Sequence, residues 1–466
     1  MVRPEAAQLP HRIHLVGVGG TGLSAIARVL ATWGHEVSGS DLNDSPIMRE
    51  LQKVGITTYI GHSAVQVNGA ELVVMSSAIP ESNPEVQAAR AAGIPVIKRQ
   101  QLLGNMMAGS FGIAVAGTHG KTTTTAMISV VLERLGLSPT FIVGGVVADL
   151  GTNAQAGGGK HFVIEADEYD RAFHGLQPQV AVVTNIEMDH PDCYQDIADM
   201  RAAFDTFLQR VPKDGHIVAC ADSVELMRVI AGRMAGGPHI LTYGASPAAQ
   251  FVVGSFAPNG QGGIDCLVAR GGRTGCSLSL AVPGVHNALN GAAAIIVAHL
   301  LGLERAEVAR VLSGYHGTLR RFEVKGQRGG ITVVDDYAHH PTQVRATLAS
   351  ARMRYPGRRI WAVFQPHTYS RTRALLAELS ACFGDADEVI ITDVYPARSR
   401  EVATVSGAEL TRAVRHPCVQ HIGSLDAVEV HLLAHLRAGD VLLTLGAGDG
   451  YLVGERVLER LARCEG

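Results

Sequence analysis

The sequence predicts an α/β protein of three domains in which helices cover mostly parallel sheets. At 466 residues, 47% of them apolar, the chain is long enough for two to four domains with full cores. Short β-branched runs alternate with helix-like stretches along most of the chain, as expected where crossover helices join parallel strands. Two glycine-rich turns, near residues 17 and 117, each stand between a strand and a helix. We expect domains at residues 1–107, 108–313 and 314–466.

The composition argues against several classes of protein. The formal net charge of −3 and the absence of long basic runs argue against nucleic-acid binding. The seven cysteines form no CxxC pair, which is typical of free thiols in a reducing compartment. The N-terminus lacks the layout of a signal peptide, and no apolar run reaches the roughly 18 residues of a membrane span. We therefore expect a cytoplasmic protein that does not insert into membranes.

The first glycine turn predicts a site for a nucleotide diphosphate. A strand at Ile13–Val18 runs into Gly17-x-Gly19-x-x-Gly22, a helix follows at Thr21–Trp33, and a second strand ends at Asp41. This is the dinucleotide fingerprint of a Rossmann-like domain, and an NAD-dependent oxidoreductase is one interpretation. A glycine turn at a helix N-terminus binds a diphosphate, however, without distinguishing one nucleotide from another. A UDP-sugar fits the same physics.

The second glycine turn predicts a site for a nucleoside triphosphate. A strand at 113–116 leads into Gly117-Thr118-His119-Gly120-Lys121-Thr122-Thr123, and a helix-like stretch continues to Leu135. Backbone N–H groups would surround the phosphates, Lys121 would reach the outer ones, and Thr122 would ligate Mg²⁺. The loop reads GxxGKT, shorter than the general GxxxxGK[ST], because Val115 stands where the first glycine would be. The alternatives are a surface turn, which the flanking strand and helix disfavour, and a nucleotide-binding regulator without catalysis.

Polar residues follow two further strands of the central domain. One strand, at 162–164, ends in Glu165-Ala166-Asp167-Glu168-Tyr169-Asp170, so that four carboxylates fall within six residues. Such carboxylates repel one another unless a cation or a basic substrate lies among them, although a solvated acidic loop is the plainer alternative. The other strand, at 180–184, leads to His190, which is a candidate metal ligand or positioning group.

A later helix carries amide and imidazole side chains. Alternating stretches between Gln250 and Leu280 first predict antiparallel strands at the edge of the central sheet. The segment 283–294 then opens a helix on which His286 and Asn290 share a face, and an amide there can match the polar edge of adenine. Helix capping by Asn287 is the alternative.

The C-terminal domain begins another series of strands and helices. Arg320-Arg321-Phe322 precedes a strand at 331–335 that leads to Asp336 and His340, and Pro341 suits the first turn of the next helix. A strand at 359–364 ends in Gln365-Pro366-His367-Thr368-Tyr369-Ser370-Arg371. A bidentate arginine is the natural partner of a small amino acid's carboxylate, which makes Arg371 a candidate for that role.

These motifs, taken in order, resemble the Mur ligases of peptidoglycan synthesis. The matching segments are HLVGVGGTGLSAIA, SGSD, SSAIP, GTHGKTTT, EADE, VTNIExDH and RRF. The resemblance implies Rossmann-like first and third domains around a central P-loop ATPase-type domain, whose mostly parallel sheet has antiparallel edge strands. It favours the alanine-adding branch, which uses ATP to join L-alanine to the carboxylate of UDP-N-acetylmuramate through an acyl phosphate. A close relative attaches a murein tripeptide to the same UDP-sugar, and this alternative stays open.

The resemblance also implies roles for individual residues. Those for the UDP-sugar are Gly19, Gly20, Asp41, His62 and Ser77; those for ATP are Gly117, Thr118, His119, Gly120, Lys121, Thr122, Thr123, His286, Asn287, Asn290, Arg321, Asp336 and His340. Two Mg²⁺ ions would be held by Thr122, Glu165 and His190, and the amino acid by His367 and Arg371. Lys121, His190 and Arg371 would be catalytic. We expect a monomer or a homodimer that binds these small molecules.

Two departures from the general family pattern are visible. Thr368 stands where relatives usually carry an arginine, which affects how a bound anion is neutralised. No lysine occurs between His190 and Lys213, so we expect no carbamylated lysine at the metal site. The residue that accepts the proton of the attacking amine is either His190 or His367 by residue type.

Overall fold

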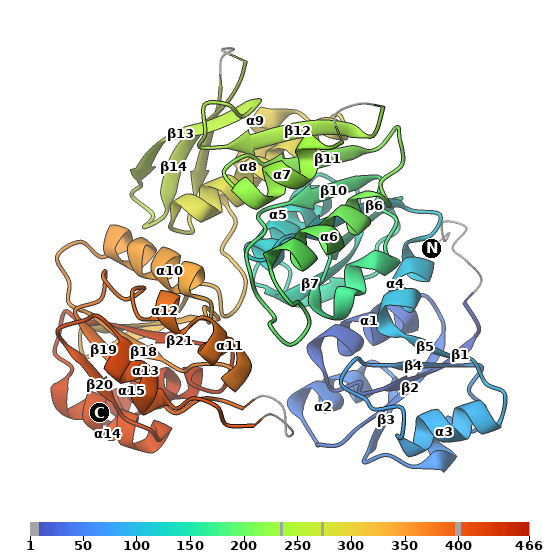
Figure 1. The fold of residues 1–466 in the computed structure, drawn as a ribbon, viewed down its shortest axis with the longest axis horizontal. Helices are drawn as coiled ribbons and strands as arrows, with labels where there is room; N and C mark the ends of the chain where they lie inside the picture. The colour runs from blue at the N-terminus through green and yellow to red at the C-terminus, as the bar shows by residue number, and fades with distance from the viewer. Residues whose placement is uncertain (1–8, 234–235, 272–274, 397–401, 466) are drawn as a thin grey trace.

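The N-terminal part of the computed structural model is a five-stranded parallel sheet with helices around it (Figure 1). The structure describes residues 9–233, 236–271, 275–396 and 402–465. The strand order is β3-β2-β1-β4-β5, which is that of a doubly wound fold. The strands are β1 Arg12–Val16, β2 Glu36–Asp41, β3 Thr57–Ile60, β4 Leu72–Met75 and β5 Val96–Lys98. The helices are α1 Thr21–Thr32, α2 Pro46–Lys53, α3 Pro84–Ala91 and α4 Arg99–Met107, with a short 3₁₀ turn at Ala64–Val67.

The central part is built on a ten-stranded sheet in the order β15-β14-β13-β12-β11-β10-β6-β9-β7-β8. Its strands are β6 Phe111–Ala116, β7 Thr140–Val147, β8 Thr152–Gln155, β9 His161–Glu165, β10 Val180–Val183, β11 His216–Cys220, β12 His239–Gly244, β13 Phe251–Pro258, β14 Ile264–Arg270 and β15 Cys276–Leu280. The pairs β13–β14, β14–β15 and β7–β8 are antiparallel, and the others are parallel. The helices are α5 Lys121–Arg134, α6 Ile197–Leu208, α7 Val224–Ala231, α8 Val285–Leu300 and α9 Arg305–Ser313, with a 3₁₀ segment, η2, at Tyr169–Gly175.

The C-terminal part has a six-stranded sheet in the order β16-β17-β21-β18-β19-β20. Only its edge strand β16 is antiparallel among the pairs described. The strands are β16 Glu323–Arg328, β17 Ile331–Asp336, β18 Ile360–Phe364, β19 Glu388–Ile391, β20 Val419–His421 and β21 Val441–Leu445. The helices are α10 Pro341–Arg354, α11 Tyr369–Ala374, α12 Leu376–Leu379, α13 Gly407–Ala413, α14 Leu425–His435 and α15 Tyr451–Glu465.

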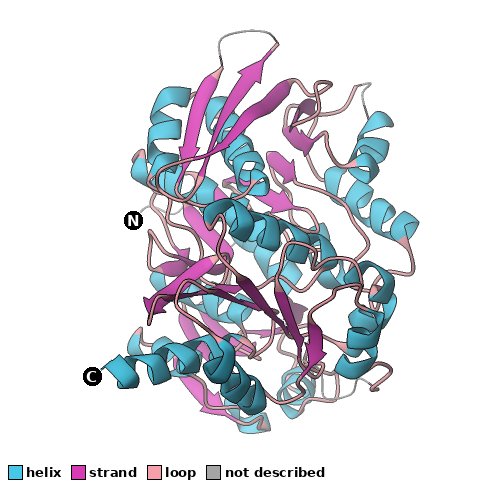
Figure 2. Ribbon diagram, turned by 90° about the vertical axis from the view of Figure 1, so that its left-hand side faces the viewer, coloured by secondary structure: helices cyan, strands magenta, loops and turns pink. Residues whose placement is uncertain are grey.

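Burial explains why these segments form layered sheets. Strands such as β4, β10, β18 and β21 are buried along their whole length, as expected of parallel strands covered on both faces. Two separate apolar clusters lie on the two sides of the C-terminal sheet, and one continuous cluster joins the N-terminal and central parts. The antiparallel pair β13–β14 of the central sheet lies at one end of the molecule, at the top of Figure 1 and of Figure 2.

The expected fold class is confirmed, including the antiparallel edge strands of the central sheet. Several short strands were not predicted, among them β3, β5, β16 and β20. These lie at sheet edges and keep many side chains in contact with solvent, so they lack the apolar runs that mark a buried strand. Among the described residues, no helix has the length and apolar character needed to cross a bilayer.

The segment that joins the central and C-terminal sheets is tied to the central sheet. The Ala148 N–H donates to Gly317 O at 3.0 Å, and the Leu319 N–H donates to Val146 O at 2.9 Å. These two bonds pair the segment around Thr318 with the end of β7 as a short antiparallel bridge. Arg321 follows directly after, so its position relative to the central sheet is fixed by main-chain hydrogen bonds.

Candidate active site

A cleft with a volume of about 1210 Å³ opens where the three sheets meet. Gly22 and Arg99 reach it from the N-terminal sheet, Lys121 from the centre, and Arg321 and Arg371 from the C-terminal part. Most residues predicted for ATP, Mg²⁺ and the amino acid line this cleft. They are Thr118, His119, Gly120, Lys121, Thr122, Thr123, Glu165, His190, His286, Asn287, Asn290, Arg321, Asp336, His367 and Arg371.

The loop at 117–123 has the geometry of a phosphate-binding turn at a helix N-terminus. Gly120 precedes α5 with φ of +80°, a conformation that side-chain-bearing residues rarely adopt. A Cβ there would also lie 2.8 Å from Asn290 Oδ1. Lys121 lies over its own loop, donating to Gly117 O at 2.6 Å and pairing with Glu168 at 2.8 Å. Burial by itself lowers the pKa of Lys121, but Glu168 raises it, so the ammonium stays charged.

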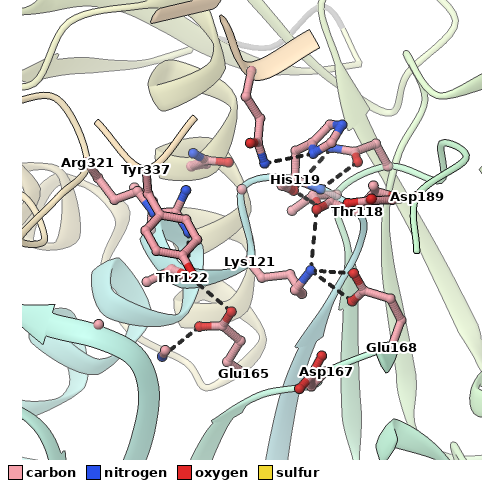
Figure 3. Close-up of a pocket in the computed structure, with 18 of the residues that line it drawn as sticks. Thr118, His119, Lys121, Thr122, Glu165, Asp167, Glu168, Asp189, Arg321 and Tyr337 are labelled. Atoms are coloured by element: carbon pink, nitrogen blue, oxygen red, sulfur yellow. Dashed lines mark hydrogen bonds and ion pairs between the residues drawn. The ribbon is translucent and has the colours of Figure 1, made fainter. Parts of the chain in front are cut away.

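Thr122 and Glu165 face each other at the entrance to α5 (Figure 3). The Thr122 hydroxyl donates to Glu165 Oε1 at 3.0 Å, and the Gly144 N–H donates to Glu165 Oε2 at 2.7 Å. Burial raises the pKa of Glu165 despite the nearby Lys121 and Arg321. The Arg321 guanidinium reaches from the C-terminal part to within 3.4 Å of the Thr122 hydroxyl. The site therefore joins a hydroxyl, a half-buried carboxylate and two cations, a set suited to a metal-bound polyphosphate.

His190 does not meet Glu165 among the contacts described. Its Nε2 lies 3.5 Å from Glu168 Oε1, and Glu168 is also the partner of Lys121. Burial lowers the pKa of His190, but Asp189 and Glu168 raise it overall. The predicted metal set is thus divided between Thr122 with Glu165 and His190 with Glu168.

Arg371 joins the C-terminal part to the central sheet. Its Nε donates to Asp189 Oδ1 at 2.6 Å, and the two side chains are only 7% and 4% exposed. The same guanidinium lies 3.3 Å from His367 Nδ1 and 3.3 Å from His190 Nδ1. The predicted amino-acid ligands therefore lie beside the predicted catalytic histidine. Thr368 caps α11 by accepting from the Arg371 N–H at 3.4 Å, so it supports Arg371 without supplying a charge.

A second bridge between the same two parts surrounds His119. Its Nε2 lies 3.3 Å from Glu187, and its Nδ1 lies 3.0 Å from the amide of Gln343. Glu187 also accepts from the Thr342 hydroxyl at 2.7 Å, while His340 Nε2 lies 3.2 Å from Met188 O.

The side chains of this second bridge could in principle hold a metal ion. Within the described part of the chain, His119, Glu187 and His340 are the one group of three metal-type side chains that converge. His340 Nδ1 already accepts from the Thr342 N–H at 3.3 Å, and the other donor atoms are hydrogen-bonded as described. We interpret the group as a hydrogen-bonded contact between domains.

The predicted adenine residues lie on α8 behind the phosphate loop. Asn290 Oδ1 accepts from the Thr124 hydroxyl at 3.1 Å, and the Asn290 amide donates to Asn287 at 3.3 Å. Asn287 donates to Pro283 O at 2.6 Å and does not cap the helix, because Gly284 holds the N-cap position. Burial lowers the pKa of His286 to about 4, so this ring is neutral at physiological pH.

Asp336 is buried at the base of the C-terminal side of the cleft. It accepts from the Phe322 N–H at 2.7 Å and from the Ala338 N–H at 2.8 Å. Burial raises the pKa of Asp336 to about 6 although Arg321 lowers it. The carboxylate therefore fixes the backbone just after Arg321 and just after Tyr337. The Tyr337 ring lies 5.0 Å from the Arg321 guanidinium.

The residues predicted for a UDP-sugar lie at the carboxyl edge of the N-terminal sheet. The Gly19 N–H donates to Asp41 at 3.0 Å, and His62 Nδ1 lies 2.8 Å from the buried Glu85. Ser77 is exposed just after β4, and Gly20 is exposed at the N-terminus of α1. These residues do not line the cleft, but their neighbours Thr21 and Gly22 do.

Sequence reasoning assigned no role to several polar residues that the structure places at the site. Among them are Arg99, Asp189, Thr342 and Gln343. A signal existed for Gln343, because His340 and Gln343 have the spacing of a capping box, which the structure contains. Asp189 and Arg99 gave no such signal, since their partners are distant in sequence.

Family models match three successive parts of the chain. The Mur ligase family catalytic domain matches residues 12–111, the Mur ligase middle domain matches 115–298, and the Mur ligase glutamate ligase domain matches 320–448. The chain belongs to the Mur ligase family. Its cleft, with a phosphate loop in the centre, therefore lies among the three units of a Mur ligase, and the ligation is ATP-dependent.

Similar Mur ligases include a UDP-N-acetylmuramate–L-alanine ligase from Rubrobacter xylanophilus, 45% identical over 97% of this chain and 100% of that protein. An enzyme of the same name from Caldanaerobacter subterraneus is 42% identical over 96% of this chain and 97% of that protein. Among solved structures, a UDP-N-acetylmuramate–alanine ligase from Thermotoga maritima has a TM-score of 0.81 at 28% identity, covering 97% and 99% of the two chains. A murein peptide ligase from Psychrobacter arcticus has a TM-score of 0.71 at 25% identity, with the same coverage.

Proposed function

We propose that this Mur ligase joins L-alanine to the carboxylate of UDP-N-acetylmuramate at the expense of ATP, releasing ADP and phosphate in peptidoglycan precursor synthesis. The observation that carries the proposal is the convergence of Lys121, Thr122, Glu165 and Arg321 on one cleft that also borders the glycine turn at Gly22. The full-length relatives with 40–45% identity bear the name of this activity. An NAD-dependent oxidoreductase leaves the phosphate loop without a role.

The central part supplies the binding site for ATP. We infer that the N–H groups at the start of α5 and the Lys121 ammonium hold the phosphates, with Lys121 exchanging Glu168 for phosphate oxygens. Arg321 would neutralise the transferring phosphoryl group from the opposite side, since it already lies beside Thr122. Asn287, Asn290 and the neutral His286 would face the adenine.

Mg²⁺ fits this arrangement of residues. The Thr122 hydroxyl and the Glu165 carboxylate would hold the ion. Burial raises the pKa of Glu165, which means that the nearby cations do not fully stabilise its negative charge and that a bound metal ion would stabilise it further. His190 and Glu168 form a second group of ligand type in the same cleft. Once bound, Mg²⁺ withdraws charge from the γ-phosphate and aligns it for attack.

The chemistry requires an activated carboxyl group. A carboxylate oxygen of UDP-N-acetylmuramate attacks the γ-phosphorus of ATP, the bond to ADP breaks, and an acyl phosphate forms. The neutral amine of L-alanine then attacks the carbonyl carbon, loses a proton and expels phosphate. We propose that Arg371 exchanges Asp189 for the alanine carboxylate, which would place the amine near His190 and His367.

The predicted domains divide this work. We propose that residues 1–107 bind the UDP-sugar through Gly19, Gly20, Asp41, His62 and Ser77, residues 108–313 bind ATP, and residues 314–466 bind the amino acid. In support, residues from all three parts line one cleft, and paired side chains such as Arg371 and Asp189 join the central and C-terminal parts beside it. Closure of the three domains on their substrates would keep water from the acyl phosphate.

Phosphate release measures this activity directly. We expect release that needs ATP, UDP-N-acetylmuramate and L-alanine together, with glycine, L-serine and the murein tripeptide compared as acceptors. Lys121→Ala should lower kcat at least about 100-fold, because it removes a charge that stabilises the transition state. Lys160→Ala, which changes an exposed lysine of the same domain, is the matched control and should act like the parent enzyme. Full activity of Lys121→Ala, or release without a UDP-sugar, would contradict the proposal.

A further inference from the structure

Arg99 lies where the N-terminal sheet meets the acidic segment of the central part. It is the first residue of α4 and comes directly after β5, at the carboxyl end of that strand. Helix α4 packs closely on η2, where a Cβ at Gly104 would collide with Gly175 O. This contact between main chains leaves no room for a side chain, so α4 is held closely against the central part.

The two ends of the Arg99 guanidinium point at different structures. Nη2 donates to Asp167 Oδ2 at 2.6 Å, across the boundary between the two parts. Nη1 lies at the glycine turn, so close to Gly22 that a Cβ added at that position would overlap it. Gly22, the third glycine of the fingerprint, leaves this space to the guanidinium, and a side chain there would displace Nη1.

Two positive groups thus meet at the same turn. The N-terminus of α1 carries the partial positive charge of a 12-residue helix, and no side chain caps it. The Arg99 guanidinium adds a full positive charge from a separate element. Because like charges repel, this arrangement favours an anion at the turn, and Asp167 supplies a counter-charge only at the other end of the guanidinium.

We propose that Arg99 binds the diphosphate of the UDP-sugar through Nη1 while Nη2 keeps its ion pair with Asp167. This inference rests on the proposed function, in which the glycine turn receives that diphosphate. The planar fork of an arginine can serve two acceptors at once, which a lysine cannot do with the same geometry. Arg99 then links the diphosphate to the segment that also carries Glu165 and Glu168 at the phosphate loop.

The link has a consequence for the reaction. The carboxylate to be phosphorylated belongs to the sugar attached to this diphosphate, and the γ-phosphoryl group that it attacks would lie over Lys121. An arginine that contacts both the diphosphate and the acidic segment fixes the separation of the two nucleotides. Arg99 thus acts as a substrate ligand of the first domain and as a positioning residue for the second.

The neighbouring Lys98 provides a matched control. It also crosses to the central part, pairing with Asp170 at 3.4 Å, but its side chain is 44% exposed and does not line the cleft. Arg99→Gln and Lys98→Gln therefore each remove one positive charge and one ion pair between the same two parts. Only the first removes a group from the glycine turn.

Binding of UDP and of uridine, each titrated without ATP and followed by ligand-observed NMR, tests the proposal. In Arg99→Gln we expect UDP to bind about 10- to 100-fold more weakly, the loss typical of a hydrogen bond to a charged group, while uridine binds unchanged. Lys98→Gln should bind both as the parent does. Gly22→Ala, which retains the arginine but displaces Nη1, should weaken UDP selectively as well.

Turnover provides the second readout. Arg99→Gln should raise KM for UDP-N-acetylmuramate about as much as it weakens UDP, with KM for ATP unchanged. Equal UDP affinity in Arg99→Gln and the parent overturns the inference, and so does equal weakening of UDP and uridine, which indicates general damage to the domain. Failure of the proposed function looks different, because the parent enzyme itself would then release no phosphate with any acceptor.

Discussion

The buried ion pair between Asp189 and Arg371 allows the contact between the central and C-terminal parts to be tested. Asp189→Asn removes the charge and keeps the shape of the side chain. Asp189 Oδ1 accepts from the backbone N–H of His190 at 2.7 Å, and the asparagine oxygen can do the same. The substitution leaves the Arg371 guanidinium buried without its counter-charge. We therefore expect a large loss of stability in the C-terminal part, where Arg371 lies.

The magnitude follows from geometry and burial. At an effective dielectric constant of about 20, unit charges separated by the 2.6 Å of this pair attract by about 6 kcal/mol, and desolvation offsets part of that gain. Removing one partner of such a buried pair costs about 3–5 kcal/mol. Burial raises the pKa of Asp189, but Arg371 holds it well below 3.8. The stabilisation is therefore present above about pH 4 and is lost as the pH falls through the folded-state pKa.

Urea unfolding followed by Trp361 fluorescence measures this loss. The chain has two tryptophans, so a Trp33→Phe background leaves Trp361, on β18 of the C-terminal sheet, as the reporter. A double-mutant cycle with Arg371→Gln should give a coupling energy of at least about 2 kcal/mol. Asp426→Asn is the control, because Asp426 pairs with Arg456 at a similar 2.7 Å but is 89% exposed.

Additive costs for the two single substitutions would refute the reasoning. They would show that Asp189 and Arg371 do not meet in solution in this arrangement. A loss in Asp426→Asn as large as that in Asp189→Asn would also refute it, because burial would then not decide the energy of the pair.

Two further predictions concern pH and metal. Burial lowers the pKa of His340 to about 4 from 6.5, so its contribution to stability is present above pH 6.5 and lost as the pH falls towards 4. When the pH falls from 6.5 to 5, the free energy of unfolding in urea should drop by about 2 kcal/mol less in His340→Asn, which can still cap α10, than in the parent. Equal drops in the two proteins would contradict this. Glu165→Gln should raise the Mg²⁺ concentration for half-maximal phosphate release about 10-fold or more, whereas an unchanged Mg²⁺ requirement would remove Glu165 from the metal site.

Much of the fold could be predicted because its signals are local. The buried strands β4, β6 and β21 are short apolar runs, and the turns at residues 17 and 117 carry glycines before a helix. The edge strands β5 and β20 were missed because they lack such a local signal. Their stability comes from pairing with a neighbouring strand.

The choice of partners at the site could not be predicted in the same way. Thr122, Glu165 and His190 were expected to hold two Mg²⁺ ions, but the sequence did not indicate that His190 pairs with Glu168, which also holds Lys121. Both glutamates stand at the end of one strand, three positions apart. Which of them faces the histidine depends on how the loop after β9 packs, and no short-range pattern encodes that packing.

The sequence by itself determined the order of several features along the chain, because each is a pattern of neighbouring residues. They are two glycine turns expected to bind nucleotides, a strand that ends in acidic residues, and a helix with amide side chains suited to adenine. Only the tertiary structure decided that Arg371 meets Asp189, 182 positions away, and that Arg99 crosses the N-terminus of α1 to reach Asp167. The physical reason is range. Turn conformation and strand burial depend on adjacent side chains, whereas an ion pair between domains depends on where whole sheets are placed by their packing.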